Sequence, residues 1–152
     1  MTIQKNTYEQ IIKVLPEHPP EFGGLLGGKD SIICATELDY GIPGEMCGYA
    51  PDVYRLNNVI KKWRQEGIYF MGIFHTHFFH VRTLSEPDKK YIIEILNSMP
   101  ERITMLYFPV AVLPEREIVP YIAVRQNPDV LIQEDKLIIL QEDDGNEECR
   151  KN

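Results

Sequence analysis

Apolar residues recur along the chain at two spacings, and these predict an alternation of helices and strands. Three segments carry apolar side chains three or four positions apart, as amphipathic helices do: 8–15, 51–66 and 85–98. Shorter runs rich in branched apolar residues predict strands at 22–28, 31–38, 68–74, 103–112 and 119–125, with short edge strands at 131–133 and 137–140. Strands and helices that share one apolar core favour an α/β or α+β fold, a mixed sheet flanked by helices.

The ends of these elements carry recognisable signals. Asn6 or Thr7 is expected to cap the first helix, and the prolines at 19 and 20 must end it. Gly67 is expected to stop the second helix, and Ser85 to open the third. Residues 39–50 are rich in glycine and proline and predict a loop, and a polar, aromatic loop is expected from His75 to Leu84.

Length and composition favour one ordinary domain. The chain has 152 residues, of which 43% are apolar and 26% charged, so its composition excludes global disorder and fibrous folds. We expect the domain to span 1–140. Residues 141–152 carry five acidic and two basic side chains, which predicts a flexible acidic C-terminal tail.

Charge and hydropathy exclude several partners. The net charge of −7 argues against a nucleic-acid partner, because affinity for phosphate backbones comes largely from Lys and Arg. No apolar run approaches the roughly 20 residues that a membrane helix needs, and the first residues lack a secretory signal pattern. A cytoplasmic location is therefore expected. The three cysteines at 34, 47 and 149 form no CxxC pair, so neither a disulfide framework nor a thiolate zinc site is expected.

A cluster of histidines follows the predicted strand 68–74. Residues i and i+2 of a strand point to the same side, so His75 and His77 can aim two imidazoles at one point. Two imidazoles and one carboxylate suffice for a catalytic zinc with an open fourth position, and Asp88 is a candidate third ligand. Two alternatives remain: Ser85 and Asp88 also fit a helix capping box, and His80 could complete a three-histidine site.

The whole pattern, His75-x-His77-x7-Ser85-x2-Asp88, resembles the His-x-His-Pro-x6-Ser-x2-Asp motif of the JAMM/MPN+ (JAB domain) zinc metalloproteases, prokaryotic type. Upstream, Glu21 and the glycine-rich segment after it resemble in part the family's Glu-x-x-Gly-x-Leu-x-Gly segment. The order of elements is similar too. The resemblance is strong over residues 20–95. It implies an MPN/JAB-like, cytidine-deaminase-like fold.

The resemblance also implies roles for the matched residues. His75, His77 and Asp88 would be ligands of one Zn²⁺, Glu21 the general base, and Ser85 the hydroxyl that stabilises the oxyanion. The implied activity is a zinc-dependent peptidase or isopeptidase acting on a protein or peptide substrate. Prokaryotic relatives cut near the C-terminal Gly-Gly of ubiquitin-like or sulfur-carrier proteins.

The sequence departs from the family pattern at one position of the motif. Phe78 stands where the family has proline, and Phe79 follows it. These two aromatic residues either line a substrate groove or pack beneath the loop. Two other functions stay open: a non-catalytic MPN-type scaffold module, and a small-amide metallohydrolase that uses His75, His77 and His80.

Overall fold

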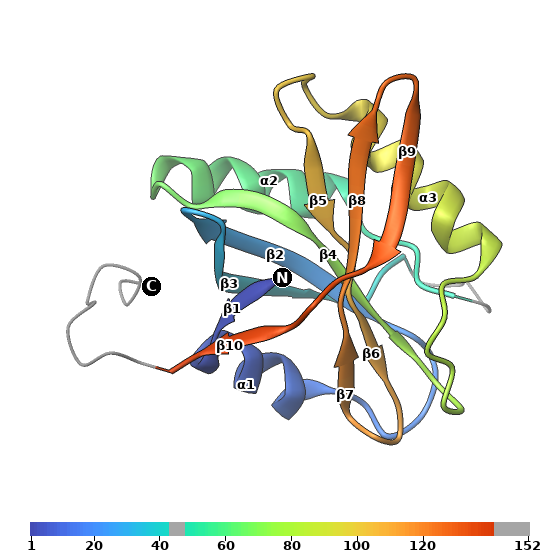
Figure 1. The fold of residues 1–152 in the computed structure, drawn as a ribbon. Helices are drawn as coiled ribbons and strands as arrows, with labels where there is room; N and C mark the ends of the chain where they lie inside the picture. Colours follow the sequence, from blue (N-terminus) through green and yellow to red (C-terminus); the bar gives the residue numbers. More distant parts are fainter. Residues whose placement is uncertain (43–47, 142–152) are drawn as a thin grey trace.

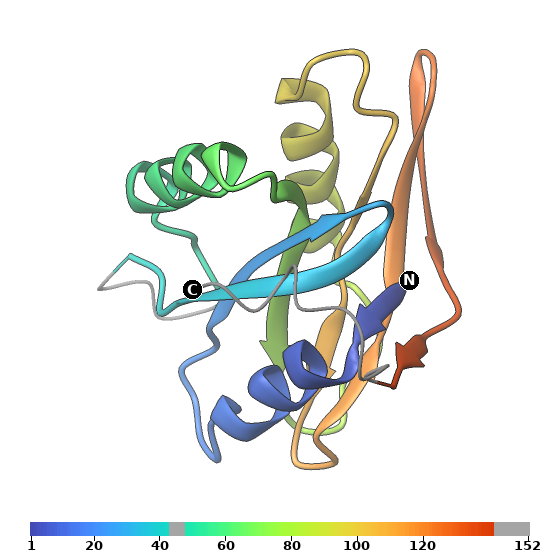
Figure 2. The same ribbon diagram turned by 90° about the vertical axis from the view of Figure 1, so that its left-hand side faces the viewer.

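A curled mixed sheet forms the centre of the protein, and helices cover both of its faces (Figure 1, Figure 2). The computed structural model describes residues 1–42 and 48–141. The helices are α1 (Lys5–Val14), α2 (Val53–Gln65) and α3 (Glu86–Ser98). The strands are β1 (Thr2–Gln4), β2 (Gly23–Lys29), β3 (Ile32–Asp39), β4 (Tyr69–His77), β5 (Met105–Tyr107), β6 (Val110–Val112), β7 (Glu117–Val119), β8 (Tyr121–Gln126), β9 (Asp129–Glu134) and β10 (Ile138–Leu140). The predicted mixed sheet flanked by helices is confirmed.

The strands follow the order β10-β1-β3-β2-β4-β5-β8-β9, and β6 and β7 extend from β4 as a hairpin. Strand β4 lies at the middle of this arrangement. It is antiparallel to β2 and parallel to both β5 and β6. A strand paired on both edges is held in one register, so the side chains on β4 have fixed positions.

The two faces of the sheet bury separate apolar clusters, which alternate along β2 and β4. Leu25 and Ile73 belong to a cluster closed by α2 and α3, whereas Leu26 and Phe74 belong to one closed by α1. The helices supply apolar residues to both clusters: Ile11 of α1, with Leu15 at its C-cap, on one side, and Leu56, Trp63, Ile92 and Leu96 on the other. Alternate residues of one strand thus serve opposite layers.

Two predicted strands are wrong in extent, and proline is the reason. The run 103–112 divides into β5 and β6 at Pro109, and the run 119–125 divides into β7 and β8 at Pro120. Proline offers no N–H to a strand ladder. The division lets β5 pair with Gly72 of β4 while β6 pairs farther along the same strand.

The predicted cap of the first helix and the predicted end of the strand 68–74 also need correction. Helix α1 begins at Lys5, and its N-cap is Gln4, which makes no side-chain cap, rather than Asn6 or Thr7. The segment before it forms β1, which pairs with β3 and β10 and fixes where the helix starts. Strand β4 continues to His77, beyond the predicted end at Phe74, because its last residues pair with β6.

Some sequence predictions fall outside the described residues. These are the acidic tail from residue 142 onward, the part of the loop at 43–47, Cys47 and Cys149. Cys34 is half-buried on β3. Among the residues that the structure describes, no helix has both the length and the apolar composition needed to cross a membrane.

Candidate metal centre

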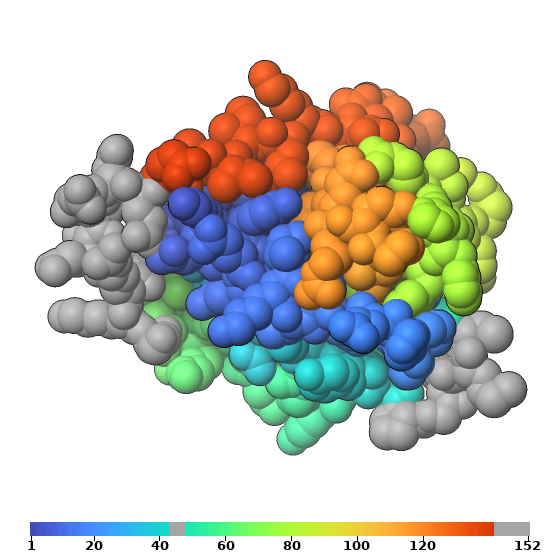
Figure 3. Space-filling view, turned by 90° about the horizontal axis from the view of Figure 1, so that it is seen from below, coloured from blue at the N-terminus to red at the C-terminus, as the bar shows by residue number. Residues whose placement is uncertain are grey.

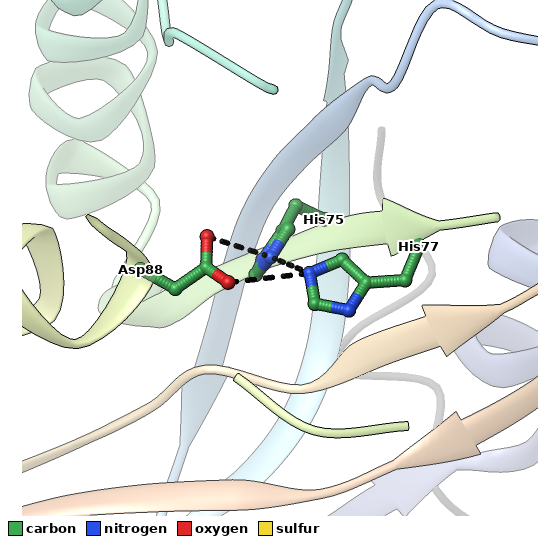
Figure 4. A group of neighbouring side chains, drawn as sticks. All are labelled: His75, His77 and Asp88. Carbon is green, nitrogen blue, oxygen red and sulfur yellow. Dashed lines mark hydrogen bonds and ion pairs between the residues drawn. The ribbon is translucent and has the colours of Figure 1, made fainter. Parts of the chain in front are cut away.

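Three side chains converge where the end of β4 meets the start of α3 (Figure 4). The Nε2 atoms of His75 and His77 are 2.8 Å apart. Oδ1 of Asp88 lies 3.4 Å from Nε2 of His75, and Oδ2 lies 3.3 Å from Nε2 of His77. A tetrahedral zinc with bonds of about 2.05 Å separates its ligand atoms by about 3.3 Å. The spacing of these atoms fits such an ion, so the group can hold a metal.

The alternation along β4 explains why the two imidazoles meet. His75 and His77 share the parity of Ile73 and therefore lie on the α2–α3 side of the sheet. Thr76 points to the opposite side and is fully buried. Both histidines are more than nine-tenths buried, so the polar pair sits at the edge of an apolar core. A buried polar group needs a partner, and Asp88 supplies it.

Asp88 serves the helix and the site together. Ser85 is the N-cap of α3, and its Oγ accepts a hydrogen bond from the Asp88 N–H at 3.2 Å. Oδ2 of Asp88 accepts in turn from the Ser85 N–H at 2.7 Å and from its hydroxyl at 2.6 Å. The capping box and the ligand position are therefore both present. Hydrogen bonds to a coordinating carboxylate also fix its orientation.

Charge and burial oppose each other at this group. Burial disfavours an ionised Asp88, but hydrogen bonds from His75 and His77 outweigh it and hold the pKa of the carboxyl far below its usual range. Burial likewise disfavours a charged His77, yet its hydrogen bond and attraction to Asp88 raise the pKa of the imidazole. The carboxylate is thus ionised at neutral pH, as a metal ligand must be.

Glu21 lies beside this group because of the register between β2 and β4. Gly23 pairs with His75, and the Thr76 N–H donates to the Phe22 carbonyl at 2.8 Å. Extending this antiparallel register by two residues beyond the pair Gly23–His75 brings Glu21 opposite His77, on the same side of the sheet. Burial raises the pKa of the Glu21 carboxyl, although His77 and His75 act in the opposite direction.

Gly23 has no side chain, and the ring of Tyr49 occupies the space where one would lie. A Cβ at this position would lie 2.7 Å from the ring of Tyr49 and 2.2 Å from the Phe74 carbonyl oxygen. The Tyr49 hydroxyl donates to Oδ2 of the buried Asp39 at 2.7 Å. Tyr49 and His75 also line a cavity of about 20 Å³. Tyr49 was not predictable from the sequence, because a single aromatic residue in a glycine-rich loop carries no periodic signal.

His80 does not join the metal group within the described part of the chain. Its side chain is exposed, and its Nδ1 contacts Glu115 in the turn between β6 and β7. The three-histidine arrangement that the spacing allowed is therefore not the one that the structure forms. Asp88 takes the third position.

A groove of about 530 Å³ opens onto the site. His77, Asp88, Ser85 and Glu21 all contribute to its lining, so the four polar residues face one common space. Volumes of this order are usual for ligand sites. Phe78 is buried in the cluster beneath α1, whereas Phe79 is 79% exposed at the groove.

Comparison with known proteins supports the fold. No protein-family model matches the sequence, and no curated protein matches it. A solution structure of a Desulfitobacterium hafniense protein is similar at 21% identity over 93% of each chain, with a TM-score of 0.68. A JAB1/MPN domain protein from Archaeoglobus fulgidus is similar at 17% identity, covering 92% of this chain and 99% of that one, with a TM-score of 0.55. A Salinibacter ruber protein is similar at 15% identity over 95% and 94%, with a TM-score of 0.57. The MPN/JAB-like fold expected from the sequence is confirmed.

Proposed function

We propose that the protein is a zinc-dependent peptidase or isopeptidase that hydrolyses an amide bond of a protein or peptide substrate. The observation that carries this proposal is the convergence of two imidazoles and a carboxylate beside the carboxyl of Glu21. If Asp88 and the two histidines formed only a structural ion pair, no further carboxyl would be needed beside them. The nearby Glu21 carboxyl, facing the same groove, is what hydrolysis requires.

The residues divide the chemistry among them. His75, His77 and Asp88 would hold a zinc ion, which would lower the pKa of a bound water to about 7 and polarise a carbonyl. The Glu21 carboxylate accepts the proton of the attacking water and passes it to the departing amine. Burial raises the pKa of this carboxyl above its ordinary value, which makes the carboxylate a stronger proton acceptor. The Ser85 hydroxyl, at the same groove, would turn from Oδ2 of Asp88 and donate to the oxyanion as it develops.

Metal content tests the ligand set. We expect about one zinc per chain by elemental analysis of the zinc-loaded protein, and much less in Asp88→Ala, because a tetrahedral site needs three protein ligands. His80→Ala is the matched control and should keep its zinc, since His80 faces Glu115. Loss of zinc from the His80 variant would contradict the assignment. A wild-type protein that stays empty after loading would favour the scaffold function.

Replacement of Glu21 by Gln tests the base. The variant should bind zinc as the wild type does and should lose amide hydrolysis by about 10²–10⁴-fold, the usual contribution of a general base. Hydrolysis is measured with a library of internally quenched peptides. A variant that cleaves as fast as the wild type would show that Glu21 is not the base.

A further inference from the structure

The most exposed phenylalanine of the described chain stands at the rim of the groove. Phe79 is 79% exposed, and its neighbour Phe78 is 7% exposed. Single exposed apolar residues are common on protein surfaces. Phe79 differs because of its backbone and its surroundings.

Phe79 occupies a turn that its residue type does not favour. Phe79 and His80 have φ values of +57° and +64°, and the Val81 N–H donates to the Phe78 carbonyl at 3.3 Å across them. Glycine, asparagine and aspartate dominate such positions, and a bulky residue with positive φ is an outlier. The backbone therefore holds an aromatic side chain outward at a cost in strain.

The loop is fastened to the β6–β7 hairpin, which keeps this side chain in place. The His80 N–H donates to the Leu113 carbonyl at 3.0 Å, and the His80 ring contacts Glu115. Arg82 forms an ion pair with Glu117. Figure 3 shows the loop and the hairpin side by side on one face, with the segment that leads into β2 next to them. Phe79 is thus presented to solvent by a fastened loop.

The groove that Phe79 borders is lined by apolar as well as polar side chains. The apolar residues are Pro19, Pro20, Phe78, Phe79, Val81 and Pro87. Glu21, His77 and Asp88 line the same groove, so a peptide that fills it also meets the candidate metal centre. A glycine pair has no side chain with which to cover the apolar residues. Large apolar side chains gain free energy from this contact in proportion to the area they bury.

We propose that Phe79 determines specificity: it contacts a large apolar side chain of the substrate next to the amide bond that is cut. The occupant of the groove is then a peptide segment with a leucine or aromatic residue at that point, and not a Gly-Gly segment. The position of the cut amide bond in this inference rests on the proposed function. The preference for a large apolar side chain rests on the residues that line the groove.

Binding to two matched peptides tests the inference. The probes are fluorescein-labelled hexapeptides of alanine whose central pair is Leu-Phe in one and Gly-Gly in the other. Affinities are measured by fluorescence anisotropy in the zinc-loaded Glu21→Gln protein, which prevents turnover. We expect the Leu-Phe peptide to bind at least about tenfold more tightly.

Variants locate the preference. Phe79→Ser should lower the ratio of the two affinities about tenfold, and Phe79→Leu should retain most of it, because leucine still offers apolar area. Tyr54→Ser is the matched control, since Tyr54 is 83% exposed on α2 and does not line the groove. This control should leave the ratio unchanged. Equal affinities, an unchanged ratio in Phe79→Ser, or no binding of either peptide at millimolar concentration would each overturn the inference.

Cleavage by the zinc-loaded wild type separates this inference from the proposed function. Cleavage of both peptides with equal kcat/KM would overturn the preference and support the peptidase. Binding that depends on Phe79, without cleavage of any peptide, would support the groove as an apolar peptide site and contradict the peptidase. Cleavage of the Leu-Phe peptide alone would support both.

Discussion

Replacement of Thr76 by valine tests how the strand that carries the histidines is held to the segment that carries Glu21. Thr76 is fully buried between His75 and His77. Its Oγ1 accepts a hydrogen bond from the Phe22 N–H at 3.0 Å and donates one to the Phe22 carbonyl at 3.2 Å. The hydroxyl therefore joins β4 to the residue next to Glu21. Valine keeps the shape of threonine and removes both hydrogen bonds.

The magnitude follows from which partner is left without a hydrogen bond. The Phe22 carbonyl still accepts from the Thr76 backbone N–H at 2.8 Å, but the Phe22 N–H loses its acceptor in a buried place. An unsatisfied buried donor costs about 1–3 kcal/mol, so we expect Thr76→Val to lose about 2 kcal/mol of unfolding free energy. For a chain of this length that corresponds to a fall in Tm of about 4–8 °C.

Thr76→Ser is the matched control. It keeps the hydroxyl and loses one buried methyl group, which costs about 1 kcal/mol. Both variants are measured by urea unfolding, where equal m-values allow the midpoints to be compared. A valine variant as stable as the wild type, or more stable than the serine variant, would refute the idea that the hydroxyl holds these strands together.

Two further substitutions test the surroundings of the site. Burial, and then Asp39, raise the pKa of the Tyr49 phenol, so the folded state favours its neutral form below about pH 10 and loses this advantage as the pH rises further. Tyr49→Phe should lower the free energy of unfolding by about 1.5–3 kcal/mol at pH 8. Its difference from the wild type should shrink above pH 10 by up to about 1.4 kcal/mol per pH unit. A difference that does not change with pH would count against the link between folding and the ionisation of Tyr49. Gly72 has φ +149°, and a Cβ there would lie 1.7 Å from the Tyr107 carbonyl oxygen, so Gly72→Ala should lose at least about 2 kcal/mol by thermal unfolding. Gly67→Ala, at φ +72° where a Cβ would meet only the flexible Lys29 side chain at 3.8 Å, should lose only about 1 kcal/mol. Equal losses in the two variants would show that the contact with β5 is unimportant.

The sequence was most informative where a local period determines the structure. The spacing of two residues between His75 and His77 predicts their common side, and the capping pattern at Ser85 predicts the first turn of α3. Both features depend only on near neighbours in the chain. For the same reason the apolar faces of α1 and α3 were predictable.

Features that depend on distant partners could not be predicted in the same way. Strand β1 is three residues long, and its pairing with β3 and β10 has no local signal. The contact of Tyr49 with Asp39 and Gly23 arises only when a loop folds over the sheet. The division between a buried Phe78 and an exposed Phe79 depends on the turn after β4. Each of these is fixed by tertiary structure.

The alternation along β4 has a consequence for how such a sequence can change over time. One strand supplies the two candidate ligand histidines to one layer and the core residues Phe74 and Thr76 to the other. Substitutions on either side can accumulate separately. Insertion or deletion of a single residue ahead of His75 would exchange the two sides together, turning the imidazoles into the apolar layer beneath α1. The histidine motif and the core of this strand are therefore inherited as one unit, and length variation must fall in the loops beyond its ends.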